Sequence, residues 1–344
     1  MFRRMLGLAA LAALLATVAV SPPAHAAPLV GGVAGGGAQP WNDRRPADYA
    51  AMRAAGATWL RGDIAWEYLQ PTNDPYRWDL YDPAVADARA AGLEYLAILH
   101  MVPAWANGGR GNYAPPSNMA LLTDYCYQVV KRYLPRGVRH YEIGNEVNLP
   151  HPGWNLSGRY YVSRLLSPCV SGVRRASAEL RLPVTIFLGA LAPHECCAGT
   201  PPTTYLTDVY AAGGAGLFDL LSWHPYTTDP RTHPNMNSVP DQLNDITVRR
   251  TGSSRQIWAT EYGAPTAGEF SVDEAWQARL VGEAYSAWSR HPYAGPLLWY
   301  AIRDEGAPPS TEREHFFGLL RNNGDPKPAY AEFSRVLGGS GSPG

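Results

Sequence analysis

Short apolar runs alternate with longer amphipathic stretches along most of the chain. Eight runs of about five or six residues are rich in Val, Ile, Leu and aromatic residues, which is typical of buried strands. They cover residues 29–33, 58–63, 94–99, 138–143, 184–189, 218–223, 256–260 and 297–301. Because the runs are continuously apolar rather than alternating, they indicate a parallel sheet covered on its faces by helices.

The stretches between these runs predict helices. Several begin at Pro, Asp or Asn and end near Gly, as at Gly56 and Gly92, which is the expected asymmetry of helix ends. The helices are predicted at 47–55, 83–91, 118–133, 159–180, 240–250, 272–290 and 328–337. Eight strands alternating with helices over roughly 310 residues predict an α/β fold with a single parallel eight-stranded (β/α)₈ TIM barrel.

A doubly wound open sheet is the alternative fold. Such a sheet usually has a Gly-rich phosphate-binding turn between an early strand and a helix. The segment GGVAGGGAQP at 31–40 is rich in glycine, but it continues into Trp41 and Asn42 rather than into a helix. We therefore interpret it as a loop.

The two ends of the chain differ from the middle. Arg3 and Arg4 precede an apolar stretch at 5–20, and small residues follow around Ala26. This order is typical of a secretory signal peptide, so residues 1–27 are expected to be cleaved near Ala26 or Ala27, with secretion of a soluble protein. A membrane anchor is the alternative, but the apolar run is short for a bilayer span, and no stable membrane insertion is expected. The catalytic domain is predicted at 28–337 and a disordered tail at 338–344.

Charge and aromatic composition restrict the partners. The formal net charge is −1 and no run of Lys or Arg occurs, which argues against nucleic acid or an anionic membrane surface. The chain has 11 Trp and 20 Tyr against 7 Phe, and flat rings with a polar edge suit a sugar. The composition favours a carbohydrate partner that is uncharged or weakly charged.

Four cysteines allow three fully paired connectivities. We favour Cys126 with Cys169, because both lie in predicted helices that flank the strand at 138–143, and this leaves Cys196 and Cys197 as a vicinal pair. The spacing is poor for zinc, so we expect disulfides, no metal and no cofactor.

Polar and aromatic side chains follow the predicted strands at their carboxyl ends. In a barrel these ends meet on one rim, where active sites are built. The rim candidates are Arg61, Trp66, His100, Trp105, Asn145, Glu146, His224, Tyr226, Glu261 and Trp299. Glutamates elsewhere, such as Glu142, are expected to be solvated.

Glu146 and Glu261 therefore converge on one pocket from the fourth and seventh strands. Two carboxylates are what hydrolysis of a glycosidic bond requires, since the departing oxygen needs a proton and the anomeric carbon needs a nucleophile or an anion. Carboxyl groups about 5–5.5 Å apart retain the anomeric configuration, and a wider gap inverts it.

Several segments together resemble the retaining glycoside hydrolases of clan A, most closely families 39 and 5. The main motifs are YEIGNEVN at 141–148 and IWATEYGAP at 257–265. Four further segments are also similar to the corresponding segments of these families, namely LRGDIAWEYLQP, DLLSWHPY, LLWYAIRDE and FGLLRNNGDPKPAYAEF. Many clan members have Trp before the Asn-Glu pair and Pro after it, where this chain has Gly144 and Val147. The resemblance covers essentially the whole mature chain.

The resemblance implies roles for the reacting groups. Glu146 would be the acid/base, protonated at first, and Glu261 the ionised nucleophile that forms the glycosyl-enzyme. Asn145 would hydrogen-bond the 2-hydroxyl of the sugar, and Tyr226 would hold Glu261.

It also implies supporting residues. His224 and Arg61 would fix the polar network around the nucleophile, and Trp299 would form the floor beneath the reacting sugar. His100, Trp66 and Trp105 are further rim residues that could contact substrate.

The expected function is a secreted retaining O-glycosidase, a monomer that hydrolyses β-glycosidic bonds of a polysaccharide or oligosaccharide by double displacement. The loops at 101–116, 151–158 and 227–240 would select the sugar. A catalytically silent carbohydrate-binding barrel is the alternative. A hydrolase of another bond would need a serine or metal centre, and the sequence has no G-x-S-x-G motif.

Overall fold

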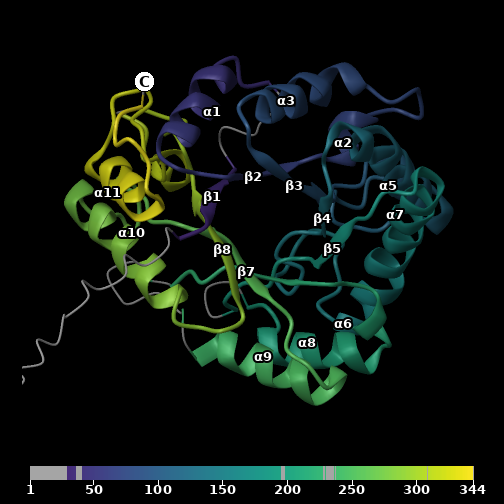
Figure 1. Cartoon of the computed structure of the whole chain (residues 1–344). Helices are drawn as coiled ribbons and strands as arrows, with labels where there is room; N and C mark the ends of the chain where they lie inside the picture. Colours follow the sequence, from purple (N-terminus) through teal and green to yellow (C-terminus); the bar gives the residue numbers. More distant parts are fainter. Residues whose placement is uncertain are drawn as a thin grey trace, which may run out of the picture.

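The computed structural model describes residues 29–35, 41–194, 198–227, 229, 236, 238–307 and 309–343. Eight parallel strands form a ring in their centre, and helices surround it (Figure 1). The strands are β1 (Gly31–Ala34), β2 (Trp59–Asp63), β3 (Glu94–Leu99), β4 (His140–Ile143), β5 (Thr185–Leu188), β6 (Leu221–Trp223), β7 (Ile257–Tyr262) and β8 (Ala294–Tyr300).

The ring closes between its two terminal strands. The hydrogen-bonded order is β5-β4-β3-β2-β1-β8-β7-β6. Parallel bridges join Phe187 to Leu220 and Leu191 to Trp223, so β5 also pairs with the β6 side. The predicted (β/α)₈ TIM barrel is confirmed.

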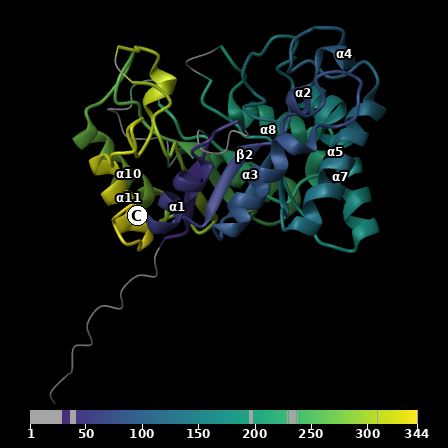
Figure 2. The same cartoon turned by 90° about the horizontal axis from the view of Figure 1, so that it is seen from above.

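Helices cover the outside of the ring (Figures 1 and 2). The long ones are α1 (Arg45–Ala54), α3 (Trp78–Ala90), α5 (Met119–Tyr133), α7 (Ser167–Leu180), α8 (Pro202–Ala211), α9 (Ser238–Thr251), α10 (Glu274–Trp288) and α11 (Pro328–Leu337). Three short helices are α2 (Trp66–Leu69), α4 (Ala104–Asn107) and α6 (Gly158–Tyr161).

Three helix predictions need correction. Helix α3 begins at Trp78, and Pro83 lies inside it rather than at its start. The single helix predicted over 159–180 is divided into α6, a π-helical segment Val162–Leu166 and α7. Helix α8 was not predicted, although its first residue, Pro202, is well suited to the first turn of a helix.

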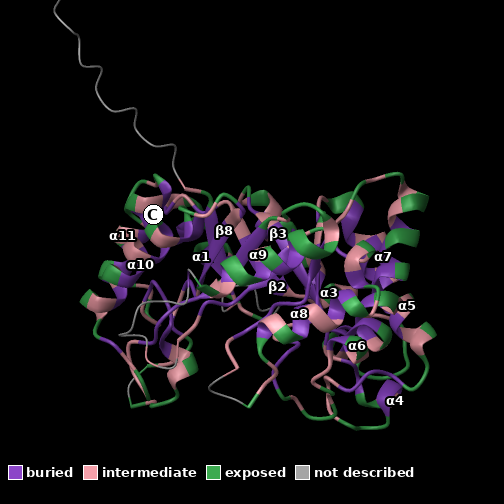
Figure 3. Ribbon diagram, turned by 90° about the horizontal axis from the view of Figure 1, so that it is seen from below, coloured by how far each residue is buried: buried purple, intermediate pink, exposed green. Residues whose placement is uncertain are grey.

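Side chains that point into the barrel form layers. The lower layer is apolar and aromatic, with Trp59 edge-on to Trp258 at 4.6 Å and Phe187 edge-on to Trp258 at 4.9 Å. Arg61 follows Trp59 by two residues on β2, and Glu142 follows His140 by two residues on β4, so both charged side chains lie on the same inner face one layer higher. A much larger apolar core lies between strands and helices. The buried residues of these elements are purple in Figure 3. The charged layer of the barrel therefore rests on a packed aromatic one.

A disulfide joins two outer helices. Cys126 of α5 and Cys169 of α7 are bonded, as the sequence predicted. Closing a loop of this length stabilises a protein by about 2–4 kcal/mol. The expected pair Cys196–Cys197 lies outside the described residues.

The carboxyl terminus packs onto the barrel as far as Gly341. The amide of Ser340 donates to the carbonyl of Ala54 at the end of α1 at 2.8 Å, and the amide of Gly341 donates to Ser334 Oγ at 2.7 Å. The first residues of the expected tail are therefore held in place. The expected signal peptide lies outside the described residues, and within those residues no helix is long and apolar enough to cross a membrane.

Candidate active site

Glu146 and Glu261 lie together at the rim of the barrel. Glu261 belongs to β7, and Glu146 follows β4 by three residues. One carboxylate oxygen from each, together with a ring nitrogen of His224, lie within 4.8 Å of one another. The two glutamates singled out in the sequence thus face one another across a short gap.

The turn after β4 explains the run Gly-Asn-Glu. Gly144 has φ +89°, and a Cβ there would lie 2.7 Å from Cγ1 of Val147, so a side chain would be strained and crowded. Glu146 itself has φ +46°, a conformation that non-glycine residues rarely adopt and that costs roughly 1–3 kcal/mol. Backbone strain of this kind concentrates at functional sites. The surrounding contacts must therefore hold Glu146 in this conformation.

Arg61 connects three acceptors of the site. Its Nε donates to Glu142 Oε2 at 2.6 Å, its Nη1 to Glu261 Oε1 at 2.7 Å and its Nη2 to Asn145 Oδ1 at 2.7 Å. Arg61 and Glu142 are both almost fully buried. The expectation that Glu142 is solvated is wrong, because its position on β4 points it into the barrel towards Arg61.

Two further side chains reach the carboxylates from the segment after β6. Tyr226 donates its hydroxyl to Glu261 Oε2 at 3.3 Å. His224 Nδ1 lies 3.0 Å from Glu146 Oε1 and 3.6 Å from Glu261 Oε2. Burial lowers the pKa of His224 to about 4, so the ring is neutral near pH 7. A neutral ring facing two carboxylates is best placed with its proton on Nδ1, donating to them.

The two glutamates differ in their partners. Burial raises the pKa of Glu146, and the pull of His151 and Arg61 only partly opposes this. Burial also raises the pKa of Glu261; His224 and Arg61 only partly oppose this, and the charges of Glu146 and Glu142 add to it. The direct donors from Arg61 and Tyr226 are both on Glu261. Of the two, Glu146 is the better placed to keep a proton.

Two adjoining cavities open at these residues. The smaller, about 150 Å³, has mainly polar walls that include Arg61, Asp63, His100 and Tyr113. The larger, about 630 Å³, extends past Glu146. Its other walls come from Leu149, Ala192, Pro193, Tyr226, Thr227, Phe270, Arg313, Glu314 and Phe317. Asn145, Glu261 and Tyr300 line both cavities.

His100 lies in the smaller cavity, as predicted for a rim residue. Its Nε2 is 2.8 Å from Asp63 Oδ1. Burial tends to raise the pKa of Asp63, but His100 and Arg61 outweigh this, and the net shift is downward. Asp63 is therefore an ionised acceptor in the wall of the same cavity as Glu261.

Three tryptophans predicted at the rim lie elsewhere. Trp299 is fully buried and packs between sheet and helices, with its Nε1 donating to the carbonyl of Phe317 at 3.3 Å. Its expected role as a floor is wrong, because Trp299 faces outward on β8 while Tyr300, one residue on, faces the cavities.

Trp66 and Trp105 belong to the short helices α2 and α4. Trp66 is buried and stacks on Tyr125 at 5.0 Å, and its Nε1 donates to Gln70 Oε1. Trp105 is edge-on to Trp66 at 5.8 Å and donates to the carbonyl of Gln70. These tryptophans pack the loop that follows β2 and are not part of either cavity wall.

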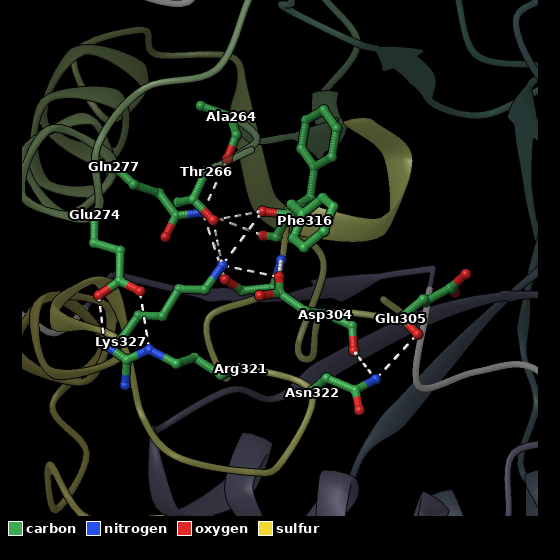
Figure 4. Close-up of polar contacts among 12 residues, drawn as sticks. Ala264, Thr266, Glu274, Gln277, Asp304, Glu305, Phe316, Arg321, Asn322 and Lys327 are labelled. Atoms are coloured by element: carbon green, nitrogen blue, oxygen red, sulfur yellow. Dashed lines mark hydrogen bonds and ion pairs between the residues drawn. The ribbon is translucent and has the colours of Figure 1, made fainter. Parts of the chain in front are cut away.

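A buried network supports the loops after β7 and β8 (Figure 4). Lys327 Nζ donates to Asp304 Oδ1 at 2.8 Å, to Thr266 Oγ1 at 2.8 Å and to the carbonyl of Phe316 at 3.3 Å. Phe316 immediately precedes Phe317, which lines the larger cavity. One ammonium group thus ties the start of α11 to two loops that shape the site.

Within the described part of the chain, one group of side chains has ligand atoms close enough together to share a metal ion. It consists of Glu146, His224 and Glu261. A cation there would compete with the Arg61 guanidinium, which already donates to Glu261. The donor set fits carboxylate chemistry better than metal binding.

Sequence reasoning missed several wall residues. Tyr300 could have been found from the two-residue alternation of β8, which places Leu298 and Tyr300 on the inner face. Tyr113 and Phe270 lie in irregular loops, and Arg313 and Glu314 begin a single short 3₁₀ turn, Arg313–Phe316, so none of them has a periodic signal.

The sequence profile described as cellulase (glycosyl hydrolase family 5) matches residues 32–299. A search of curated proteins found no significant match.

Several solved structures are similar in fold. A family 39 glycoside hydrolase from Bacteroides cellulosilyticus WH2 superposes with a TM-score of 0.70 at 22% identity, over 91% of this chain and 64% of that one. This chain therefore spans less than two thirds of that protein. A GH5_18 protein from Streptomyces cattleya, solved with Manβ1-4GlcNAc, gives a TM-score of 0.67 at 18% identity, covering 90% and 80% of the two chains. Fungal β-1,4-galactanases give 0.61 at 18% identity, covering 84% and 90%.

Proposed function

Because the chain belongs to the cellulase family, glycoside hydrolase family 5, we propose that it is a secreted retaining β-glycosidase that acts on a polysaccharide or oligosaccharide by double displacement. The observation that carries the retaining mechanism is the gap between the carboxylates. Oxygens of Glu146 and Glu261 lie within 4.8 Å, close to the short separation of retaining enzymes and well below the 6.5–9.5 Å typical of inverting ones.

In the first step Glu261 attacks the anomeric carbon and Glu146 protonates the departing oxygen. Arg61 and Tyr226 donate to Glu261, which favours its ionised form and fixes the direction of its oxygens. When Glu261 becomes an ester, its negative charge disappears. The electrostatic repulsion that disfavoured a second carboxylate beside it is then lost. Glu146 can then ionise and take a proton from the water that releases the sugar.

The two cavities divide the substrate between them. The smaller one, with its polar walls, would hold the sugar that is attacked, with Asn145 near its 2-hydroxyl and Tyr300 against the ring. The larger one, on the Glu146 side, would hold the leaving group. The solved neighbours named for Manβ1-4GlcNAc and β-1,4-galactan support a β-linked glycan as the substrate class.

The direct test is a Glu261→Ala variant assayed on a panel of β-glucan, β-mannan, xylan and β-galactan. It should fold normally and lose nearly all hydrolysis, while Glu332→Gln on the outer helix α11 should keep it. A 2-deoxy-2-fluoro glycoside should label the wild type at Glu261. Full activity of Glu261→Ala would overturn the proposal, and sugar binding without hydrolysis by the wild type would favour a silent binding barrel instead.

Export is the other part of the proposal. If residues 1–27 are a signal peptide, protein secreted by a bacterial host should begin near Ala27 or Pro28. N-terminal sequencing of the secreted form tests this, and a retained leader would contradict it. A monomer is proposed for the secreted protein, and sedimentation equilibrium at the mass of one chain would agree with it.

A further inference from the structure

The loop that carries Glu146 rests on a pair of stacked rings. Tyr113, from the loop between β3 and α5, and His151, from the loop between β4 and α6, lie with ring centroids 3.7 Å apart and planes 10° from parallel. Both lie in loops that were expected to select the sugar, but neither side chain was singled out from the sequence. We propose that the Tyr113–His151 stack is a positioning device that sets Glu146 for proton transfer to the leaving group. This inference rests on the proposed function.

His151 holds Glu146 through its backbone. Its Nε2 lies 3.2 Å from the carbonyl oxygen of Glu146, and the amide of Leu149 donates to the same oxygen at 2.9 Å. Burial lowers the pKa of His151, so near pH 7 the ring is neutral and can donate from Nε2. These two donors hold the carbonyl group of Glu146, a residue whose φ of +46° lies in the left-handed region.

Tyr113 acts on the neighbouring residue. Its hydroxyl interacts with the side chain of Asn145, which favours the ionised form of Tyr113. Because Asn145 Oδ1 already accepts from Arg61 Nη2, the amide nitrogen is the Asn145 group available to Tyr113. The two rings together hold both residues of the Asn-Glu pair, one by its side chain and the other by its carbonyl.

The loops that carry the rings are packed backbone to backbone. A Cβ at Gly111 would lie 2.6 Å from the carbonyl oxygen of Pro152, and one at Gly153 would lie 2.2 Å from that of Arg110. Both glycines have positive φ, +99° and +76°. Only glycine permits this approach, so the stack is built into the contact between two loops rather than being a chance meeting of side chains.

This positioning matters because the Glu146 carboxyl has few direct constraints. Its side chain is 24% exposed, and among the described residues its hydrogen-bonding partner is His224 Nδ1. Glu261, by contrast, is held by Arg61 and Tyr226. The direction of the Glu146 side chain is therefore set largely by its backbone. Loss of the stack should impair proton donation and leave nucleophilic attack intact.

Leaving-group dependence separates this role from a general structural one. 2,4-Dinitrophenol leaves without a proton, whereas phenol needs the acid. We therefore compare 2,4-dinitrophenyl and phenyl β-glycosides of glucose, mannose, galactose, xylose and cellobiose, using the sugar that the wild type cleaves fastest. His151→Ala should lose at least tenfold more kcat/KM on the phenyl substrate than on the dinitrophenyl one. His151→Gln, which can still donate to the carbonyl, should recover most of the loss.

The chain offers a matched control. His291 also stacks on a tyrosine, Tyr293 at 5.1 Å, and its Nε2 lies 2.6 Å from the carbonyl oxygen of Met236. It lies just before β8, at the opposite end of the barrel from the glutamates. His291→Ala should leave the ratio of the two activities unchanged. Tyr113→Phe, which keeps the stack but loses the hydroxyl, should have a smaller effect than Tyr113→Ala.

The outcomes are separable. If His151→Ala loses kcat/KM equally on both substrates, or loses none, the positioning role is overturned. The proposed function still stands in that case, provided that Glu146→Gln loses kcat/KM selectively on the phenyl substrate. If His151→Ala does not fold, Tyr113→Ala, which also removes the stack and should lose more activity on the phenyl substrate, decides by the same ratio. Absence of cleavage of every substrate by the wild type, or an unaffected Glu146→Gln, would overturn the proposed function itself.

Discussion

Arg61 Nη1 lies 2.7 Å from Glu261 Oε1, and this contact comes from a guanidinium that is itself 1% exposed. The same group neutralises Glu142, which is fully buried. Arg61 therefore serves both the charge balance of the barrel interior and the ionisation of the proposed nucleophile. Those two roles can be separated by mutation.

Arg61→Met should nearly abolish hydrolysis and lower the free energy of unfolding by about 3–5 kcal/mol, because Glu142 is left buried without a counter-charge. The double variant Arg61→Met/Glu142→Gln should recover much of the stability and none of the activity. Urea unfolding and steady-state kinetics check this. If the double variant is as unstable as the single one, the buried pair is not the source of the loss.

Trp299 and Tyr300 should respond in opposite ways. Trp299→Ala removes a buried indole and should cost about 3–5 kcal/mol of unfolding free energy. Tyr300→Ala removes a cavity wall and should lower kcat/KM by tenfold or more with a much smaller change in stability. Thermal unfolding and kinetics on one substrate measure both. A Tyr300→Ala variant with wild-type kinetics would show that Tyr300 does not pack against the ring of the bound sugar.

Lys327 should be a stability determinant that also affects the site. Burial lowers the pKa of Lys327 and raises that of Asp304, which shows how costly either charge would be without the other. Lys327→Met should lower the unfolding free energy by about 3–5 kcal/mol. Lys131→Met, which breaks an exposed pair with Glu179, should have almost no effect. Similar losses in the two variants would contradict a special role for the buried pair.

The pH dependence of kcat/KM should be bell-shaped. The proton donor must be protonated, so activity is lost as pH rises through the raised pKa of Glu146. On the acid side activity is lost as Glu261 takes up a proton. In Glu146→Gln, assayed with a 2,4-dinitrophenyl glycoside, the alkaline limb should disappear while the acid limb stays. An alkaline limb that persists unchanged would assign it to another group.

The features that could be predicted from the sequence are those marked by a regular repeat of apolar positions, namely the strands and most helices. The predicted strand at 94–99 coincides with β3, and the strand ends placed Glu146, Glu261 and Arg61 on one rim. The errors arise where a position is fixed by a partner distant in sequence or by a shift of one residue. Trp299 is the clearest case, since a strand reverses the direction of its side chains at each residue.

Loops set the remaining limits. Trp66 and Trp105 follow strand ends but lie on short helices that fold them into the loop core. Tyr113 and His151 meet only because two loops pack closely at glycines. Neither contact has a local sequence signal, because each depends on the geometry of a second segment.

The stereochemistry of the first product tests the central claim most directly. Proton NMR recorded within minutes of adding enzyme to a β-glycoside shows which anomer is released before mutarotation. Oxygens of Glu146 and Glu261 within 4.8 Å of each other predict the β-anomer, with retained configuration. Initial release of the α-anomer would contradict the double-displacement mechanism.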